Sequence, residues 1–560
     1  MTPKWTLAFA VLLLQAVGAW GQVTTLKFKQ ERDGDAVKVL SNAESATLGD
    51  SLFQLLLKEN AGESTLDGIL GKLQPAADKR RLFVVHEKIA SEKPEGAFRR
   101  GVVAFNGTNG GESLQGNVML SIGVGADGKV GGDIEAWGWD NHRGRYNYYK
   151  LDELGAAEGK RVWKFRGSSE NADLMSAGER KGTCLQCHTT GAPVMKELLF
   201  PWNNWHGKVG TAFKANYLDP KSTHPAKWPA ATTPLFERLA GAEELETDHL
   251  IPAFKRFNES RVNALLLRED GTGNRLLTNG RLTLTGANRL LRSLFVPTEV
   301  NLLSSRDGSG FHPFGATTDF LPDKQILLPE DFFLHTSLIG GGLQLVSAKK
   351  FSTFAKLKQS ENKALVEKFT LRLNGKPGDA HFAWLVPTPS FIDTDMADRL
   401  MKLGAVTPHF LAAVLAVDLE EPLFSAKRAE LLKLLPERLE FTPLPEGTDP
   451  TSVPRDTEKD QLTKAVIAKI DAANPTPGSP ADELRTLLKE PDAVKALDKK
   501  CQAYAARVET ALNTPATRPA ELERLFAVLV ARRKAMLNNP LFAPLDETGG
   551  RLLFPLPASD

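Results

Sequence analysis

The chain has 560 residues, enough for roughly three or four domains of about 150 residues each. Its hydrophobic content of 42% and charged content of 25% are ordinary for a soluble globular protein. The formal net charge is only +2, so the composition gives no support to nucleic acid or an acidic membrane surface as a partner.

The N-terminus predicts a secretory signal peptide over residues 1–21. Lys4 precedes the apolar run LAFAVLLLQAVGA, and Ala19-Trp20-Gly21 forms a small-x-small cleavage site before Gln22. The alternative is an uncleaved anchor, but the run is short for a bilayer span, and no later segment of the sequence is apolar enough to cross one. We therefore expect an exported protein, periplasmic in a bacterium or secreted, with no integral span after signal removal.

Residues 22–79 are expected to form an N-terminal helical segment after one short strand. SLFQLLLKEN and STLDGILGKLQ carry apolar residues at helical spacing. Residues 80–235 predict a β-rich domain, because β-rich runs such as QGNVMLSIGV and KRVWKFRG are separated by clusters of Gly, Asn and Asp. This pattern is typical of an antiparallel meander, with GADGK as its clearest hairpin. A short helix over SSENADLMSAGERKG then leads to Cys184.

The remainder of the chain becomes increasingly helical. Residues 236–440 predict a mixed α/β to helical region, residues 441–456 a Pro-rich linker, and residues 457–560 a C-terminal helical hairpin or bundle. The expected fold class is therefore α+β. An antiparallel β-meander domain leads into a haem-attachment segment and is followed by the mixed region and the mainly helical part.

Residues 184–188, Cys-Leu-Gln-Cys-His, carry the clearest chemistry. C-x-x-C-H is the attachment signature of c-type haem. Two thiols one helical turn apart can reach the two vinyl groups on one edge of a porphyrin and form thioethers, and the next residue then lies under the macrocycle. The pattern predicts that Cys184 and Cys187 hold one covalent haem c and that His188 is the proximal iron ligand.

Other uses of paired cysteines fit the sequence less well. Three cysteines are too few for a disulfide scaffold. A zinc ribbon needs a second C-x-x-C or a suitably spaced His pair, and the sequence has neither. A redox dithiol needs a βαβ context, whereas a β-meander and a short helix are expected before Cys184. The motif resembles the haem-binding motif of c-type cytochromes, and this resemblance covers five residues. Cys501 lies in a predicted amphipathic helix, as either a buried small side chain or an intermolecular thiol.

Aromatic residues gather around the motif. Of the seven tryptophans left after residues 1–21 (nine less Trp5 and Trp20), six fall between residues 137 and 228, as do four of the five tyrosines. Such side chains suit the large flat surface of a haem, and they equally suit the core of a sheet. The two interpretations are compatible. The residues are Trp137, Trp139, Trp163, Trp202, Trp205, Trp228, Tyr146, Tyr148, Tyr149 and Tyr217.

The second axial position of the iron is left open by the sequence. Met195 and His206 are the distal candidates, and either would give a six-coordinate iron suited to electron transfer. Each has an ordinary alternative, Met195 as a core residue of a helix and His206 as a polar loop residue. An open site or a distant ligand is the third reading.

An open site would imply chemistry at the iron. The segment WGWDNHRGRYNYY places Asp140, His142, Arg143 and Arg145 on a predicted hairpin. A distal His or Arg can polarise a bound peroxide, and an Arg can pair with haem propionates. The alternative is a solvated β-turn.

The order of elements in residues 80–190 gives a second resemblance. An antiparallel sheet followed by a short helix and C-x-x-C-H is similar to the sheet-type, or β-form, cytochromes c-prime and their hydroxylamine-oxidising relatives. That resemblance implies a five-coordinate iron that handles small nitrogen species. The chain departs from that family because it continues from His188 to Asp560, and no cross-linking lysine is assigned.

Three functions follow from these observations. The first is an exported mono-haem cytochrome that passes electrons to and from a redox partner protein. The second is a haem-dependent oxidoreductase, with peroxide or a small nitrogen or oxygen species as substrate at an open distal face. The third is a haem-bearing sensor or scaffold whose helical tail docks a partner.

Overall fold

The computed structural model describes about half of the chain, in two compact units that are considered separately. The first unit holds the described residues up to 253 and the second those from 254 onward. The described residues are 27–29, 37–39, 47–54, 66–73, 81–86, 99–107, 114–124, 130–154, 160–169, 184–186, 188, 191–193, 238–241, 245–266, 280–295, 300–301, 326–327, 350–351, 372–373, 376–377, 388–389, 391–420, 425–517, 519–521 and 523–524.

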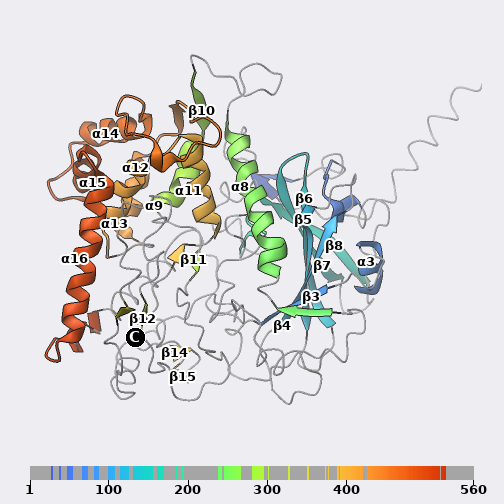
Figure 1. The fold of residues 1–560 in the computed structure, drawn as a ribbon. Coiled ribbons are helices and arrows are strands. Elements are labelled where there is room, and N and C mark those ends of the chain that lie inside the picture. Colours follow the sequence, from blue (N-terminus) through green and yellow to red (C-terminus); the bar gives the residue numbers. More distant parts are fainter. Residues whose placement is uncertain are drawn as a thin grey trace, which may run out of the picture. The chain divides into compact units, whose positions relative to one another are not determined.

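A seven-stranded sheet dominates the first unit, with the strand order β8-β7-β6-β5-β4-β3-β9 (Figure 1). Each strand from β3 to β7 pairs antiparallel with the next in sequence, and β9 joins the edge formed by β3, parallel to it. The strands are β3 Arg81–His86, β4 Arg99–Gly107, β5 Leu114–Val124, β6 Val130–Asp140, β7 Arg145–Leu154, β8 Lys160–Ser168 and β9 Arg238–Gly241.

Side-chain alternation gives this sheet two distinct faces. The register pairs Gly138 with Asn147 and Trp137 with Tyr148, so these two pairs point to opposite sides. Both faces are buried at this end of the sheet: Asn147 and Tyr148 are each 0% exposed. The aromatic residues of β6 and β7 therefore serve as sheet core, which is one of the two uses expected for them.

The N-terminal part of the first unit contains more strand than its apolar pattern predicts. Two short strands, β1 Lys27–Lys29 and β2 Val37–Val39, pair antiparallel where a mainly helical segment was expected. Their alternation of charged and apolar residues suits a two-residue period. A helical stretch then begins at Ser51, and α3 spans Leu66–Leu73. Among the described residues of 22–79, helix is therefore found only from Ser51 onward, and the earlier described residues include two strands where helix was expected.

The second unit is mainly helical in its described part (Figure 1). Short strand pairs accompany the helices: β10–β17, β11–β16, β12–β13 and β14–β15. The helices are α8 Ile251–Leu265, α9 Ala287–Phe295, α11 Phe391–Leu403, α12 Pro408–Ala416, α13 Ala426–Glu430, α14 Gln461–Ala473, α15 Pro480–Lys489 and α16 Ala493–Asn513. The strands are β10 Leu282–Thr285, β11 Val300–Asn301, β12 Ile326–Leu327, β13 Lys350–Phe351, β14 Arg372–Leu373, β15 Lys376–Pro377, β16 Thr388–Pro389 and β17 Arg438–Phe441.

The helices of the second unit begin at recognisable sequence signals. Thr407 and Ser479 cap α12 and α15, and each is followed by a proline at the first helical position. The central helix is α12, which is buried from His409 to Ala416 and packs against α9, α15 and α16. The mixed α+β class expected from the sequence is confirmed.

Residues 441–456, expected to be a linker, run along the surface of the second unit, and most side chains after Leu444 are exposed. Phe441 is 1% exposed, and a short helix, η14, spans Pro450–Ser452. Arg455 donates from Nη2 to the carbonyl oxygen of Leu488 at 3.0 Å and from Nη1 to that of Glu490 at 2.6 Å. The prolines of this segment therefore shape a connection between β17 and α14 that is hydrogen-bonded to the end of α15.

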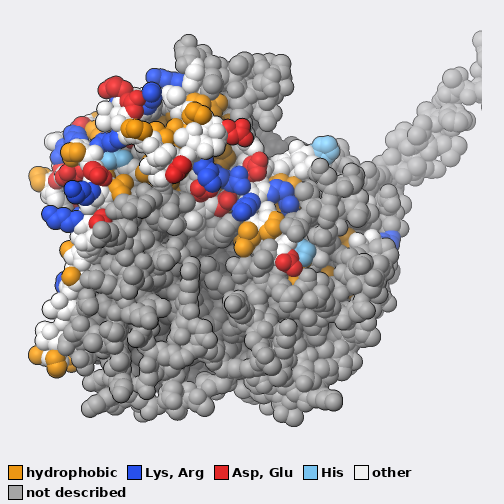
Figure 2. All heavy atoms as spheres, in the orientation of Figure 1, with side chains coloured by type: hydrophobic (Ala, Val, Ile, Leu, Met, Phe, Trp, Pro, Cys, Tyr) orange, Lys and Arg blue, Asp and Glu red, His pale blue; other side chains and the backbone are white. Residues whose placement is uncertain are grey.

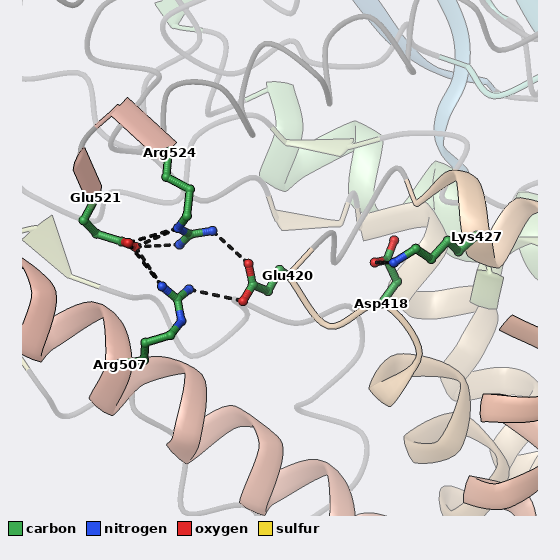
Figure 3. A network of polar contacts seen from close by, with 6 residues as sticks. All are labelled: Asp418, Glu420, Lys427, Arg507, Glu521 and Arg524. Carbon is green, nitrogen blue, oxygen red and sulfur yellow. Dashed lines mark hydrogen bonds and ion pairs between the residues drawn. The ribbon is translucent and has the colours of Figure 1, made fainter. Parts of the chain in front are cut away.

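Ion pairs join α16 to the segments around it (Figure 3). Glu420 accepts from Nη2 of Arg507 at 3.2 Å and from Nη1 of Arg524 at 2.8 Å. Glu521 accepts from the same two arginines and is only 7% exposed. Figure 2 shows that acidic and basic side chains are interspersed over the described part of this face. None of the described helices has the length and apolarity needed to cross a membrane.

Candidate functional site

The motif segment lies after β8, at the edge of the large sheet. Residues Cys184–Gln186 form one 3-10 turn, η6, which contacts β8. The amide of His188 donates to the carbonyl oxygen of Cys184 at 3.0 Å, so the turn continues to the histidine. Cys184 is half-buried and forms no disulfide with another described residue. Cys187 lies outside the described residues.

Leu185 anchors this turn to the sheet. Its side chain is 0% exposed, and its Cδ1 lies 3.4 Å from where a Cβ on Gly167 of β8 would be. The apolar residue between the two cysteines thus faces the protein. Cys184, in contrast, keeps part of its surface exposed.

The imidazole of His188 is buried against the aromatic face of the sheet. Its ring centroid lies 5.0 Å from that of Tyr148 and 5.4 Å from that of Trp137. These two residues are a cross-strand pair on β7 and β6, so a rigid part of the sheet supports the ring. His188 is 8% exposed.

A hydrogen bond to the backbone determines which nitrogen of His188 carries the proton. Nδ1 lies 2.8 Å from the carbonyl oxygen of Ala192. A carbonyl oxygen only accepts, so Nδ1 must be the protonated nitrogen, and in a neutral imidazole the lone pair is then on Nε2. Metal-binding histidines are usually held in this way, with one ring nitrogen donating to a carbonyl group or carboxylate and the other binding the metal.

The acceptor of this bond is itself held by Tyr148. The Tyr148 hydroxyl lies 2.6 Å from the carbonyl oxygen of Gly191 and 2.8 Å from that of Ala192, and it donates to both as a shared bond. The amide of Gly191 in turn donates to the carbonyl oxygen of His188 at 2.9 Å. His188 and residues 191–192 therefore form one small hydrogen-bonded loop on the phenol of Tyr148.

The opposite face of the sheet holds a separate polar cluster. Asp50 is 0% exposed, and its Oδ2 accepts from Nδ2 of Asn147 at 2.8 Å and from the hydroxyl of Tyr149 at 2.5 Å. Burial raises the pKa of Asp50, against the opposing effect of these hydrogen bonds. Burial and the charge of Asp50 raise the pKa of Tyr149 well above its ordinary value. This cluster attaches the N-terminal segment to the sheet.

The polar residues of the β6–β7 hairpin do not meet His188. Asp140 is 0% exposed and accepts from the amides of His142 and Arg143, so it closes the turn. Arg145 pairs with Asp140 in the register, on the side of Asp50, and burial lowers its pKa to about 10. His142 and Arg143 are exposed. Alternation thus directs Asp140 and Arg145 to the face opposite His188, whereas a distal role for the exposed His142 and Arg143 stays a prediction.

The remaining site predictions fall outside the described residues. These are the distal candidates Met195 and His206, with Trp202, Trp205, Trp228 and Tyr217. Nothing in the motif or the aromatic spacing predicted Tyr148 or Ala192 as partners of His188. Tyr148 is one of the ten aromatic residues around the motif. Because it lies between Asn147 and Tyr149 on the same strand, alternation places its side chain on the opposite face of the sheet from theirs.

The described residues contain no cluster of three or more His, Cys, Asp or Glu side chains arranged to hold a metal ion. Comparisons of the chain with protein-family models, with curated proteins and with solved structures found no match. The chemistry of the site therefore rests on the residues themselves.

Proposed function

We propose that this protein is an exported c-type cytochrome that carries one covalent haem c and transfers electrons in the periplasm. The observation that carries the proposal is the hydrogen bond from Nδ1 of His188 to the carbonyl oxygen of Ala192. It puts the proton on the nitrogen that faces the protein backbone and the lone pair on Nε2. In the C-x-x-C-H pattern this is the residue assigned to the iron.

The donor set fits a covalently attached haem. Cys184 supplies a thiol at the start of a helical turn, and Cys187 is placed by sequence one turn further on. The buried Leu185 keeps the turn on the sheet. Nε1 of Trp137, whose ring packs on His188, is buried and has no acceptor among the described residues. An indole N–H of this kind suits a propionate carboxylate. Bound here, a haem supplies an iron that accepts and returns one electron.

The chain itself contributes a ligand held in a fixed orientation. The aromatic pair of Trp137 and Tyr148 prevents the imidazole from rotating, since a ring packed on two neighbours has little freedom. A ligand that does not move between oxidation states keeps the reorganisation on electron transfer small. This property favours an electron carrier.

The first experiment measures covalent haem. The full chain is produced in bacteria with working haem-ligation machinery, and its intact mass, covalent-haem stain and colour are recorded. The expected product begins at Gln22 and carries one haem. Cys184→Ser combined with Cys187→Ser abolishes the covalent haem, whereas Cys501→Ser, which changes the third cysteine, retains it. A colourless product with the mass of the bare processed chain would remove the proposal.

The second experiment separates a carrier from a catalyst. A low-spin optical spectrum that CO and cyanide leave unchanged is expected for a six-coordinate carrier. Replacing His206 or Met195 by Ala should then convert the iron to a CO-binding form for whichever residue is the distal ligand. A high-spin spectrum that shifts with CO contradicts the carrier and favours the haem enzyme.

A further inference from the structure

Tyr148 and His188 donate hydrogen bonds to the same carbonyl oxygen. The Tyr148 hydroxyl and the His188 Nδ1 each lie 2.8 Å from the oxygen of Ala192. Tyr148 is 0% exposed and is fixed in the sheet by its pairing with Trp137. The phenol therefore holds the acceptor that selects the tautomer of His188.

A shared acceptor also affects how strongly the Nδ1 proton is attracted. A carbonyl oxygen that already accepts from a phenol carries less electron density for a second donor. A weaker pull on the Nδ1 proton leaves the imidazole less anionic and makes Nε2 a weaker donor to a metal. Hydrogen bonds to the second nitrogen of a histidine are a recognised means of adjusting ligand basicity and redox potential.

We propose that Tyr148 is a positioning residue for His188 that, through the carbonyl oxygen of Ala192, orients the imidazole and moderates its strength as an iron ligand. This inference rests on the proposed function, because the iron is the group that the imidazole would bind. Loss of the Tyr148 hydroxyl leaves Ala192 with one donor, so the Nδ1 proton is pulled more strongly. The more anionic imidazole favours ferric iron, and the reduction potential falls.

The chain offers a closely matched control in Tyr146. It lies two residues away on the same face of β7, is also 0% exposed, and its hydroxyl also donates to a backbone carbonyl, that of Gly116 at 3.1 Å. That carbonyl belongs to β5 and makes no contact with His188 that the structure describes. Tyr146→Phe therefore reproduces the loss of a buried phenol hydroxyl without the effect on Ala192.

The experiment compares Tyr148→Phe, Tyr146→Phe and the unchanged full chain as haem-loaded proteins. The midpoint potential is measured by spectroelectrochemistry. Tyr148→Phe is expected to retain covalent haem and to show a lower potential, with the potential of Tyr146→Phe unchanged. An unchanged or higher potential in Tyr148→Phe overturns the inference, as does an equal shift in both variants, which would indicate a general effect on the sheet.

A second measurement tests the positioning role without haem. In the full chain with Cys184→Ser and Cys187→Ser, selective ¹⁵N-histidine labelling reports the tautomer of His188. Tyr148→Phe is expected to broaden the His188 signals or reduce the Nδ1–H population, whereas Tyr146→Phe leaves them as they are. Identical spectra in all three backgrounds overturn the inference. Absence of covalent haem from the unchanged chain overturns the proposed function instead, and the tautomer measurement then decides the role of Tyr148.

Discussion

Gly191 lies so close to Ser169 that no other residue fits in its place. A Cβ on Gly191 would lie 2.7 Å from the carbonyl oxygen of Ser169 and 2.8 Å from its Cα, both of which are backbone atoms. The φ angle of Gly191 is also positive, at 74°. Since Ser169 follows β8, this close approach holds the loop of His188 and Ala192 against the edge of the sheet.

Gly191→Ala is therefore expected to displace this loop. The positive φ alone costs about 1–2 kcal/mol for a residue with a Cβ, and the clash with Ser169 adds to it. Gly447→Ala is the control, because Gly447 has a φ of 79° and open space around its Cβ position. Chemical denaturation should show a larger loss of stability at Gly191, accompanied by reduced haem loading. Equal losses at the two positions would mean that the approach to Ser169 does not matter.

Asp50→Asn is expected to change how stability depends on pH. Burial raises the folded-state pKa of Asp50 above its ordinary value of 3.8, so folding is favoured while this group is protonated. Its contribution is full below about pH 3.8 and is lost as the pH rises through the raised pKa. Between pH 4 and 7 the unchanged chain should lose stability relative to the variant, by about 1.4 kcal/mol for each unit of pKa shift. Urea denaturation across this range measures the difference, and parallel pH profiles would contradict the prediction.

His409 should make the second unit sensitive to mild acid. Its Nε2 lies 3.1 Å from the carbonyl oxygen of Leu488, and its Nδ1 accepts from the amide of Ala493 at 3.3 Å. The ring is therefore neutral, and burial lowers its pKa below 6.5. The unfolded chain takes up the proton first, so stability is complete above about pH 6.5 and falls as the pH drops through the lowered pKa.

His409→Gln removes this titration. The variant should be less stable than the unchanged chain at pH 8, because it loses one or both hydrogen bonds at about 1 kcal/mol each. Its stability should then change less between pH 7 and 5. Helical circular dichroism during denaturation at several pH values provides the measurement. If the variant loses as much stability between pH 7 and 5 as the unchanged chain, a group other than His409 causes the acid sensitivity.

The two glutamates of the ion-pair network are expected to contribute unequally to the stability of the fold (Figure 3). Glu521 is 7% exposed and Glu420 is 47% exposed, although both pair with Arg507 and Arg524. Glu521→Gln should cost about 1–3 kcal/mol, because it weakens bonds that water does not replace. Glu420→Gln should cost less than about 1 kcal/mol.

Glu458→Gln is the control for this comparison, since Glu458 pairs with Lys464 while 86% exposed. Its effect should be close to zero. Urea denaturation of the three variants, at low and high salt, ranks them. If Glu420→Gln and Glu521→Gln lower the free energy of unfolding equally, burial does not determine how much each glutamate of the network contributes.

Local patterns predicted much of what the structure describes. The turn residues of WGWDNHRGRYNYY and the two-residue period around them indicated the hairpin of β6 and β7. The caps at Thr407-Pro408 and Ser479-Pro480 are equally local signals, although they were not predicted. C-x-x-C-H singles out His188 from spacing alone, and its role as an iron ligand stays a prediction. The hairpin was predictable because it depends on residues close together in the chain.

Pairings between residues far apart in the chain could not be predicted from local sequence patterns. Nothing near Arg238 indicates that β9 pairs in parallel with β3, and nothing near Asp50 indicates that it meets Tyr149. The partnership of Tyr148 with Ala192 depends on the face of a strand and on a turn after Leu185, so two separate parts of the fold must be known before it emerges.

The strand order has a consequence for how the molecule is assembled. β8 is at one border of the sheet and β9 at the other, and the motif of residues 184–188 lies between them in the chain. The last strand is therefore synthesised after the motif has already emerged. Until β9 arrives, the outer edge of β3 has no partner in this sheet, so the motif emerges before the sheet beside it is complete.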